Sequence, residues 1–116
     1  MDSILTSVKK LLNLSEDYEY FDADIIMHIN SVLLVLNQLG IGPSEGFIIY
    51  DKTAIWDDFI GDAPLELVKS YMGLKVRLLF DPPQSSAAIE SANRMISEFE
   101  WRLNVAVETP SHKGDE

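Results

Sequence analysis

The side chains that could support chemistry are few, and the clearest pair is Asp24 and His28. A separation of four residues places both on one face of a helix, where a carboxylate and an imidazole could share a metal ion. The same spacing brings residues together on any helix, and the chain has no cysteine to supply a thiolate. We therefore expect no metal site. The second histidine, His112, falls in a polar C-terminal segment.

Other reactive residue types are present without the surroundings that catalysis needs. The acids of residues 16–24 and the pair Asp57-Asp58 lie in polar, turn-rich stretches, whereas catalytic carboxylates share a partly dry pocket. The serines lack a G-x-S-x-G sequence, and no G-K-[ST] follows the glycines of residues 40–46. The sequence predicts no catalytic residue, no cofactor and no enzyme.

Length and composition indicate one domain. A chain of 116 residues, of which 47% are hydrophobic, can bury a substantial core. It has no apolar run of about 18 residues, so we expect no membrane span. Residues 1–14 lack the pattern of a signal peptide, and the absence of cysteine fits an intracellular protein.

The charge balance is strongly acidic. There are 19 acidic and 9 basic residues, which give a formal net charge of -10. Phosphate binding needs clustered lysine and arginine, so the chain alone is not expected to bind nucleic acid. The simplest interpretation of the charge is solubility.

Helical spacing of apolar residues begins close to the N-terminus. A first helix is predicted over residues 3–13, capped by Asp2 or Ser3. Lys9 and Lys10 lie near its C-terminal end, where cations suit the helix dipole.

A second, more apolar helix is predicted over residues 22–39. Asp22 and Asp24 stand in its first turn, where negative charge is favoured, and Gly40 ends it. The helix is expected to lie at the centre of the core. Its inward stripe is predicted to include Ile25, Ile26, Ile29, Val32, Leu33, Leu34, Val35, Leu36 and Leu39.

The middle of the chain is less regular. Residues 47–50 (FIIY) are predicted to be an extended segment, with half of a small hairpin as the alternative. Residues 53–60 predict a short helical turn whose inward residues are Ile55, Trp56, Phe59 and Ile60.

Two further helices form a predicted hairpin, over residues 64–81 and 85–107, with Asp81-Pro82-Pro83 as the break. Asp62 is predicted to cap the first helix, and Ser85 or Ser86 the second. The predicted inward residues are Leu65, Val68, Met72, Val76, Leu79 and Phe80, then Ala88, Ile89, Ala92, Ile96, Phe99, Leu103 and Val107.

The predicted fold class is all-α. We expect a small bundle of four main helices plus a short helical turn, with a small extended or hairpin segment in the middle. Residues 1–107 form the helical domain in this interpretation. Residues 108–116 lack apolar periodicity and are predicted to be a flexible tail.

The last helix carries a second set of large side chains away from its inward stripe. The set consists of Met95, Trp101, Arg102 and Val105. Methionine, tryptophan and arginine are enriched in protein interfaces. We predict a protein-binding surface there, together with His112 and Lys113 of the tail. The alternative is that Trp101 packs beneath residues 47–60 of its own chain.

The order of these elements resembles the tailed-bacteriophage head–tail connector family, also called head-completion or DNA-packaging adaptor proteins. The stretch KVRLLFDPPQSSAAIESANRMISEFEWRLNV carries most of the resemblance, which extends over residues 1–107. The resemblance implies a structural subunit that forms a homo-oligomeric ring beneath the portal and extends the DNA channel. Its partners would be the portal and a downstream stopper or tail-completion protein.

The resemblance also implies a location at the head–tail interface of the virion, after assembly in the bacterial host cytoplasm. DNA would pass through the channel without sequence-specific binding, and no membrane is involved. An acidic channel wall would repel phosphates and avoid gripping moving DNA. Two alternatives remain open: a helical protein-interaction or regulatory module unrelated to virions, and a helical hydrolase with a carboxylate metal site.

Overall fold

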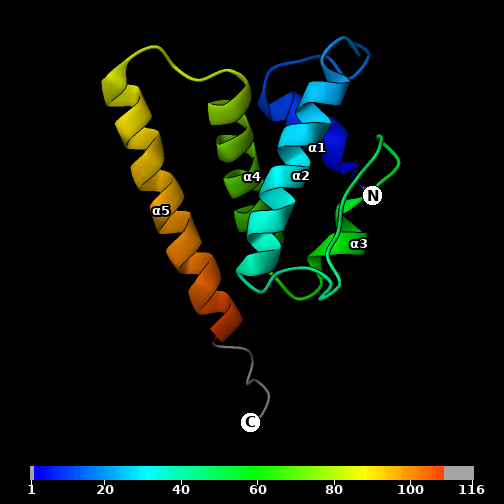
Figure 1. The fold of residues 1–116 in the computed structure, drawn as a ribbon, viewed down its shortest axis with the longest axis vertical. Coiled ribbons are helices and arrows are strands. Elements are labelled where there is room, and N and C mark those ends of the chain that lie inside the picture. The colour runs from blue at the N-terminus through cyan, green and yellow to red at the C-terminus, as the bar shows by residue number, and fades with distance from the viewer. Residues whose placement is uncertain (1, 109–116) are drawn as a thin grey trace.

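The computed structural model describes residues 2–108, and within them the fold is all-α, as predicted. No β-strand occurs in this part of the chain, which has one isolated bridge between Ser3 and Ile55. Each predicted helix is present, with ends that differ from the prediction by a few residues at most. The helices are α1 (Ile4–Leu11), α2 (Asp22–Gln38), α3 (Trp56–Ile60), α4 (Leu65–Phe80) and α5 (Ser86–Glu108) (Figure 1).

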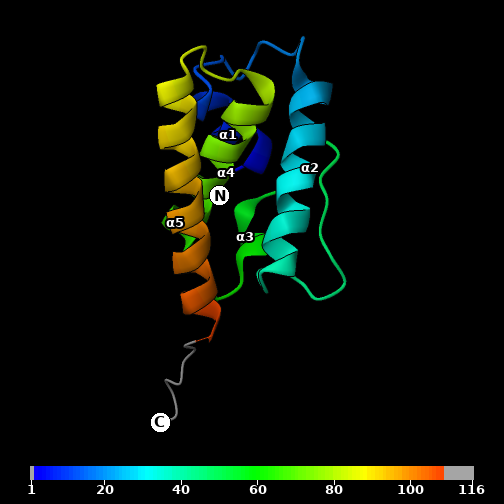
Figure 2. The ribbon, with the colours of Figure 1, turned by 60° about the vertical axis from the view of Figure 1, so that its left-hand side comes forward.

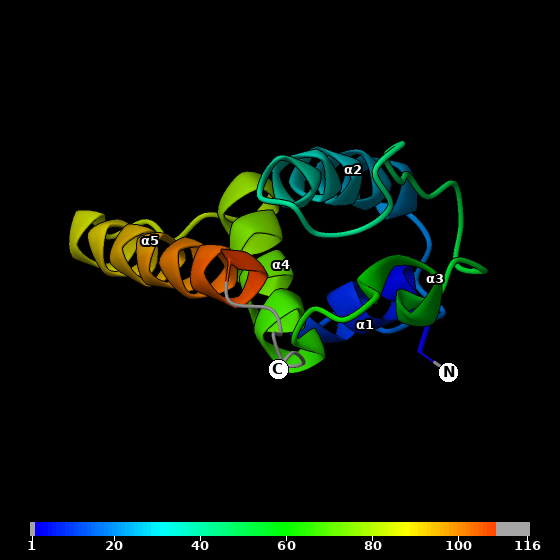
Figure 3. The same ribbon diagram turned by 90° about the horizontal axis from the view of Figure 1, so that it is seen from below.

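Helix α4 occupies the middle of the molecule. It packs against α2 on one side and α5 on the other, and α1 lies against both α2 and α4. Helix α5 stands at one edge, and the loop after α2 runs along the opposite edge (Figures 1 and 2). Seen from below, α5 projects sideways from the rest of the bundle (Figure 3). The last helix is therefore the element with the most surface available to a partner.

The core lies mainly between α1, α2, α3 and α4, and α5 adds Ile96 and Leu103. Trp56, Phe59 and Tyr71 are its largest apolar members, and the indole N–H of Trp56 donates to Ser7 Oγ at 3.1 Å. The aliphatic core residues are Ile4, Leu5, Val8, Leu12, Ile25, Ile29, Val32, Leu33, Leu36, Ile41, Ile49, Val68, Met72, Val76, Ile96 and Leu103.

Two of the three predicted side-chain caps are present. The backbone N–H of Thr6 donates to Ser3 Oγ, and that of Ala88 donates to Ser85 Oγ, each at 3.2 Å. The prediction for Asp62 is wrong. Pro64 is the residue at the cap of α4, and no side chain bonds there, because the proline ring has no hydrogen-bonding group.

Residues 47–50 form an extended segment without a hairpin partner. Asn30 of α2 holds this segment by two hydrogen bonds to Ile49: the amide Nδ2 donates to the carbonyl at 3.0 Å, and Oδ1 accepts from the backbone N–H at 2.8 Å. Farther along α2, Asn37 Nδ2 donates to the Pro43 carbonyl at 2.7 Å. The two asparagines thus supply the backbone partners that a second strand would otherwise provide.

Four residues predicted to point inward do not. Leu34 is 60% exposed and Leu79 is 50% exposed, while Ala88 and Val107 also lie at the surface. In α2 the run of three apolar residues from 33 to 35 spans about 200° of the helix, so one of them must face outward. Helix α5 packs on α4 along a narrow stripe that leaves Ala88 uncovered, whereas Val107 lies close to the turn at Gly40 and remains 36% exposed.

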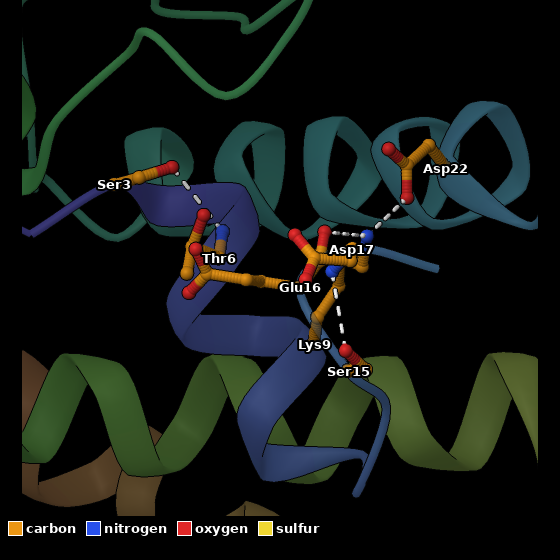
Figure 4. Close-up of polar contacts among 7 residues, drawn as sticks. All are labelled: Ser3, Thr6, Lys9, Ser15, Glu16, Asp17 and Asp22. Atoms are coloured by element: carbon orange, nitrogen blue, oxygen red, sulfur yellow. Dashed lines mark hydrogen bonds and ion pairs between the residues drawn. The ribbon is translucent and has the colours of Figure 1, made fainter. Parts of the chain in front are cut away.

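Lys9 is buried, which the sequence did not predict. Its side chain is 2% exposed, and Nζ lies 2.8 Å from Asp22 Oδ1 and 3.0 Å from the carbonyl oxygen of Glu16 (Figure 4). The neighbouring Lys10 is exposed. The lysine therefore ties the end of α1 to the connection and to the start of α2, in addition to any effect on the helix dipole.

Candidate functional site

The candidate site is the solvent-facing side of α5, and its position is set by the hairpin with α4. The chain breaks at residues 81–83 and restarts at the Ser85 cap. Of the 23 residues of α5, the buried ones are Ala92, Ile96 and Leu103, with Phe99 partly buried beside them. A helix attached by so narrow a stripe keeps most of its circumference open to solvent.

A buried polar contact fixes α5 on α4. The hydroxyl of Tyr71 in α4 donates to Glu100 Oε2 in α5 at 2.7 Å, and the tyrosine side chain is buried. Burial is the main cause that raises the pKa of Tyr71 above its ordinary value, and the bond to Glu100 adds to the rise. The phenol therefore remains protonated and keeps the carboxylate oriented.

Replacing Tyr71 by phenylalanine is expected to lower the free energy of unfolding at neutral pH by about 1–2 kcal/mol, because Glu100 loses its donor. A second effect appears at high pH. Since the pKa of Tyr71 is raised in the folded state, its contribution is complete below the unfolded value of about 10 and declines as pH rises above it. Denaturant titrations at several pH values should show that the wild type loses more stability than Tyr71→Phe above that pH. Parallel losses would contradict this role.

Trp101 is the most prominent side chain of the site. It is 67% exposed, so it does not pack beneath residues 47–60, and that alternative is wrong. Trp101 precedes the buried Leu103 by two residues and therefore lies nearly opposite it, since each residue turns the helix by about 100°. Val105, one turn later, is also exposed and lies beside Trp101.

Met95 and Arg102 lie on another side of α5, towards α4. Both are exposed and, with Leu67, Glu98 and Phe99, they line a shallow surface hollow between the two helices. The guanidinium of Arg102 makes two hydrogen bonds to Glu98 Oε2, at 2.7 and 3.0 Å. Both partners are more than half exposed, so the pair orients the arginine and adds little stability.

The four described residues of the predicted surface are thus all exposed on α5, but they occupy two sides of the helix. His112 and Lys113 lie outside the described residues. The sequence interpretation missed Arg94, which is exposed and has no ion-pair or hydrogen-bond partner among residues 2–108. Its spacing of seven residues before Trp101 places it on the same side, and that spacing was available in the sequence.

A second hollow lies where α5 ends. It is lined by Ala106 and Val107, by the turn of residues 40–43 and by residues 57–64. A Cβ atom added to Gly40 would lie 2.9 Å from Val107 Cγ1, so the close approach of this turn to α5 requires glycine. Asp57, Asp58 and Asp62 make this end of the molecule acidic.

The other sequence candidates for chemistry are not assembled into a site within residues 2–108. No group of three or more histidine, aspartate or glutamate side chains there is placed to hold a metal ion. His28 lies against Phe80, with ring centroids 6.4 Å apart, and Asp24 is exposed. No helix among the described residues is long and apolar enough to cross a membrane.

The fold and its exposed helix define a class: a small all-helical protein that presents an aromatic and arginine-bearing surface of the kind used in protein binding. Comparison with known families is more specific. The family model described as "Phage connector protein" matches residues 4–110, so the chain belongs to the phage connector family. No curated protein and no solved structure matches the chain.

Membership makes the chain a bacteriophage structural protein with a head–tail connector role. It is a virion component that interacts with other head or tail components. The family is generally non-enzymatic.

Proposed function

We propose that this chain is a connector subunit that binds the portal protein, forms a homo-oligomeric ring beneath it and extends the DNA channel toward the tail. A stopper or tail-completion protein binds the opposite side of the ring, and assembly takes place in the bacterial host cytoplasm. The observation that carries the proposal is the exposed side of α5 in a chain that belongs to the connector family. Connectors act by binding their neighbours through complementary surfaces, and α5 offers a large exposed surface for such binding.

In this proposal residues 1–107 form the connector domain, and residues 108–116 bind neighbouring components through His112 and Lys113. The net charge of -10 supports a channel through which DNA moves without sequence-specific binding, because like charges repel. A ring whose lumen is lined with lysine and arginine would contradict the charge argument.

The experiment is capture of the chain by the portal protein of the same phage. We expect the wild type to bind and a chain ending at Val107 to bind more weakly. Trp101→Ala should lose about 10–30-fold in apparent affinity, because exposed tryptophans are frequent hot spots and a captured ring depends on contacts between its subunits as well as on those with the portal. The free energy of unfolding of Trp101→Ala should lie within about 0.5 kcal/mol of the wild-type value.

Leu79→Ala is the matched control, because Leu79 is a large exposed apolar residue on α4 rather than α5. It should bind the portal like the wild type. Failure of the wild-type chain to bind the portal would overturn the proposed function. Equal binding by the wild type and Trp101→Ala would exclude this side of α5 from the contacts of the assembled ring.

A further inference from the structure

An apolar groove lies on the side of the molecule away from α5. It runs between α2 and the extended segment that Asn30 holds, and Met27, Leu34 and Tyr50 along it are all more than half exposed. The remaining lining residues are Ala23, Ile26, Asn30, Ser31 and Ile49. The core accounts for none of these exposed side chains, so the groove is available to another molecule.

The charges around the groove differ from those on α5. No lysine or arginine is among the residues that line the groove. In the sequence Asp24 adjoins the lining residue Ala23, and Asp51 and Lys52 follow the lining residue Tyr50. Asp51 accepts hydrogen bonds from the hydroxyl and backbone N–H of Thr53, which lower its pKa and keep it charged. On α5, Arg94 has no acidic partner among the described residues and lies on the same side as Trp101.

We propose that the groove receives α5 of a second copy of this chain, with Trp101 and Val105 against Met27, Leu34 and Tyr50, and Arg94 toward Asp24 or Asp51. An aromatic and aliphatic pair one turn apart on a helix is suited to a groove of this kind. The two surfaces pair apolar with apolar and cation with anion. The match is therefore in apolar side chains, with a local charge match at Arg94 alone, since Glu90 and Glu108 also lie on this side of α5.

The arrangement of the two surfaces sets the symmetry of the contact. Helix α5 and the segment that borders the groove lie at opposite edges of the molecule in three views (Figures 1, 2 and 3). A contact between different surfaces is head-to-tail, and repeated head-to-tail contacts close into a ring or extend as a filament. This inference rests on the proposed ring and identifies which surfaces form its subunit contact.

Single cysteines can test the contact, because the natural chain has none. Ser31 lines the groove and Ser97 is exposed one turn before Trp101, so Ser31→Cys and Ser97→Cys place one thiol beside each surface with little change in shape. The two full-length variants are mixed in equal amounts with the portal protein and a short bis-maleimide crosslinker. We expect crosslinks between the two variants to exceed by about fivefold those within either one.

Two controls make the result specific. Ser70 is exposed on α4. Ser70→Cys should crosslink with Ser31→Cys and with Ser97→Cys no more than randomly colliding thiols do. Adding Leu34→Gln to the groove variant, or Trp101→Ala to the α5 variant, should abolish the excess, whereas Leu79→Gln should leave it unchanged. Crosslinks in random proportion, or mainly between identical variants, would overturn the inference. Portal capture together with random crosslinks would leave the proposed function standing and remove only this interface.

Discussion

Replacing Lys9 by methionine is expected to lower the free energy of unfolding by about 3 kcal/mol. The substitution keeps the apolar length of the side chain but removes the ammonium that lies 2.8 Å from Asp22 Oδ1. The carboxylate is then left partly buried without its cation, and the Glu16 carbonyl loses a donor. Asp22 remains 26% exposed, so the cost lies at the lower end of the range for broken buried pairs.

The matched control is Lys10→Met, since Lys10 is the next residue and is exposed. Urea titration should place Lys10→Met within about 0.5 kcal/mol of the wild type. The double variant Lys9→Met with Asp22→Asn should recover much of the loss, because it removes the unpaired charge. If Lys9→Met proved as stable as Lys10→Met, the ion pair would have no structural role.

Replacing Gly42 by alanine is the second substitution with a large expected effect, about 3 kcal/mol of lost stability. Gly42 has φ +92, a conformation that side chains with a Cβ rarely adopt, and this strain costs about 1 kcal/mol. The added Cβ would also overlap the ring of Phe59, with Cδ1 2.9 Å away. Phe59 is buried and cannot move aside easily, so overpacking adds about 2 kcal/mol.

Gly46→Ala separates the two causes. Gly46 has a similar φ of +97, but a Cβ there would meet nothing within 4 Å. Its substitution should therefore cost only the backbone strain, about 1 kcal/mol. The measurement is the free energy of unfolding of both variants from denaturant curves. Equal losses at the two glycines would show that the Phe59 ring yields to the added methyl group.

The order and type of the helices could be predicted because strong 3.6-residue periodicity is a local property of the sequence. Periodicity could not predict which side of α2 faces solvent, because apolar residues surround most of that helix. Leu34 was consequently predicted to point inward, although it is exposed. The burial of Lys9 could not be predicted either, since it depends on how the connection brings Asp22 back to α1.

The exposed residues of α5 were more accessible to sequence reasoning. Trp101 lies far from the stripe of Ile96 and Leu103, and the structure confirms that it is exposed. The groove on α2 was missed because it depends on Asn30 holding residues 47–50 beside the helix. A contact between residues 19 positions apart leaves no periodic signal. The exposed side of α5, which lies on a single helix, could therefore be predicted. The groove, which is formed by α2 together with residues 47–50, could not.

Electron cryomicroscopy of the full chain mixed with the portal protein of the same phage tests the connector function most directly. The account predicts a closed ring of this chain stacked on the portal, with Trp101 of each copy buried against protein. A portal ring without added density, or a bound chain whose Trp101 faces solvent in every copy, would contradict it.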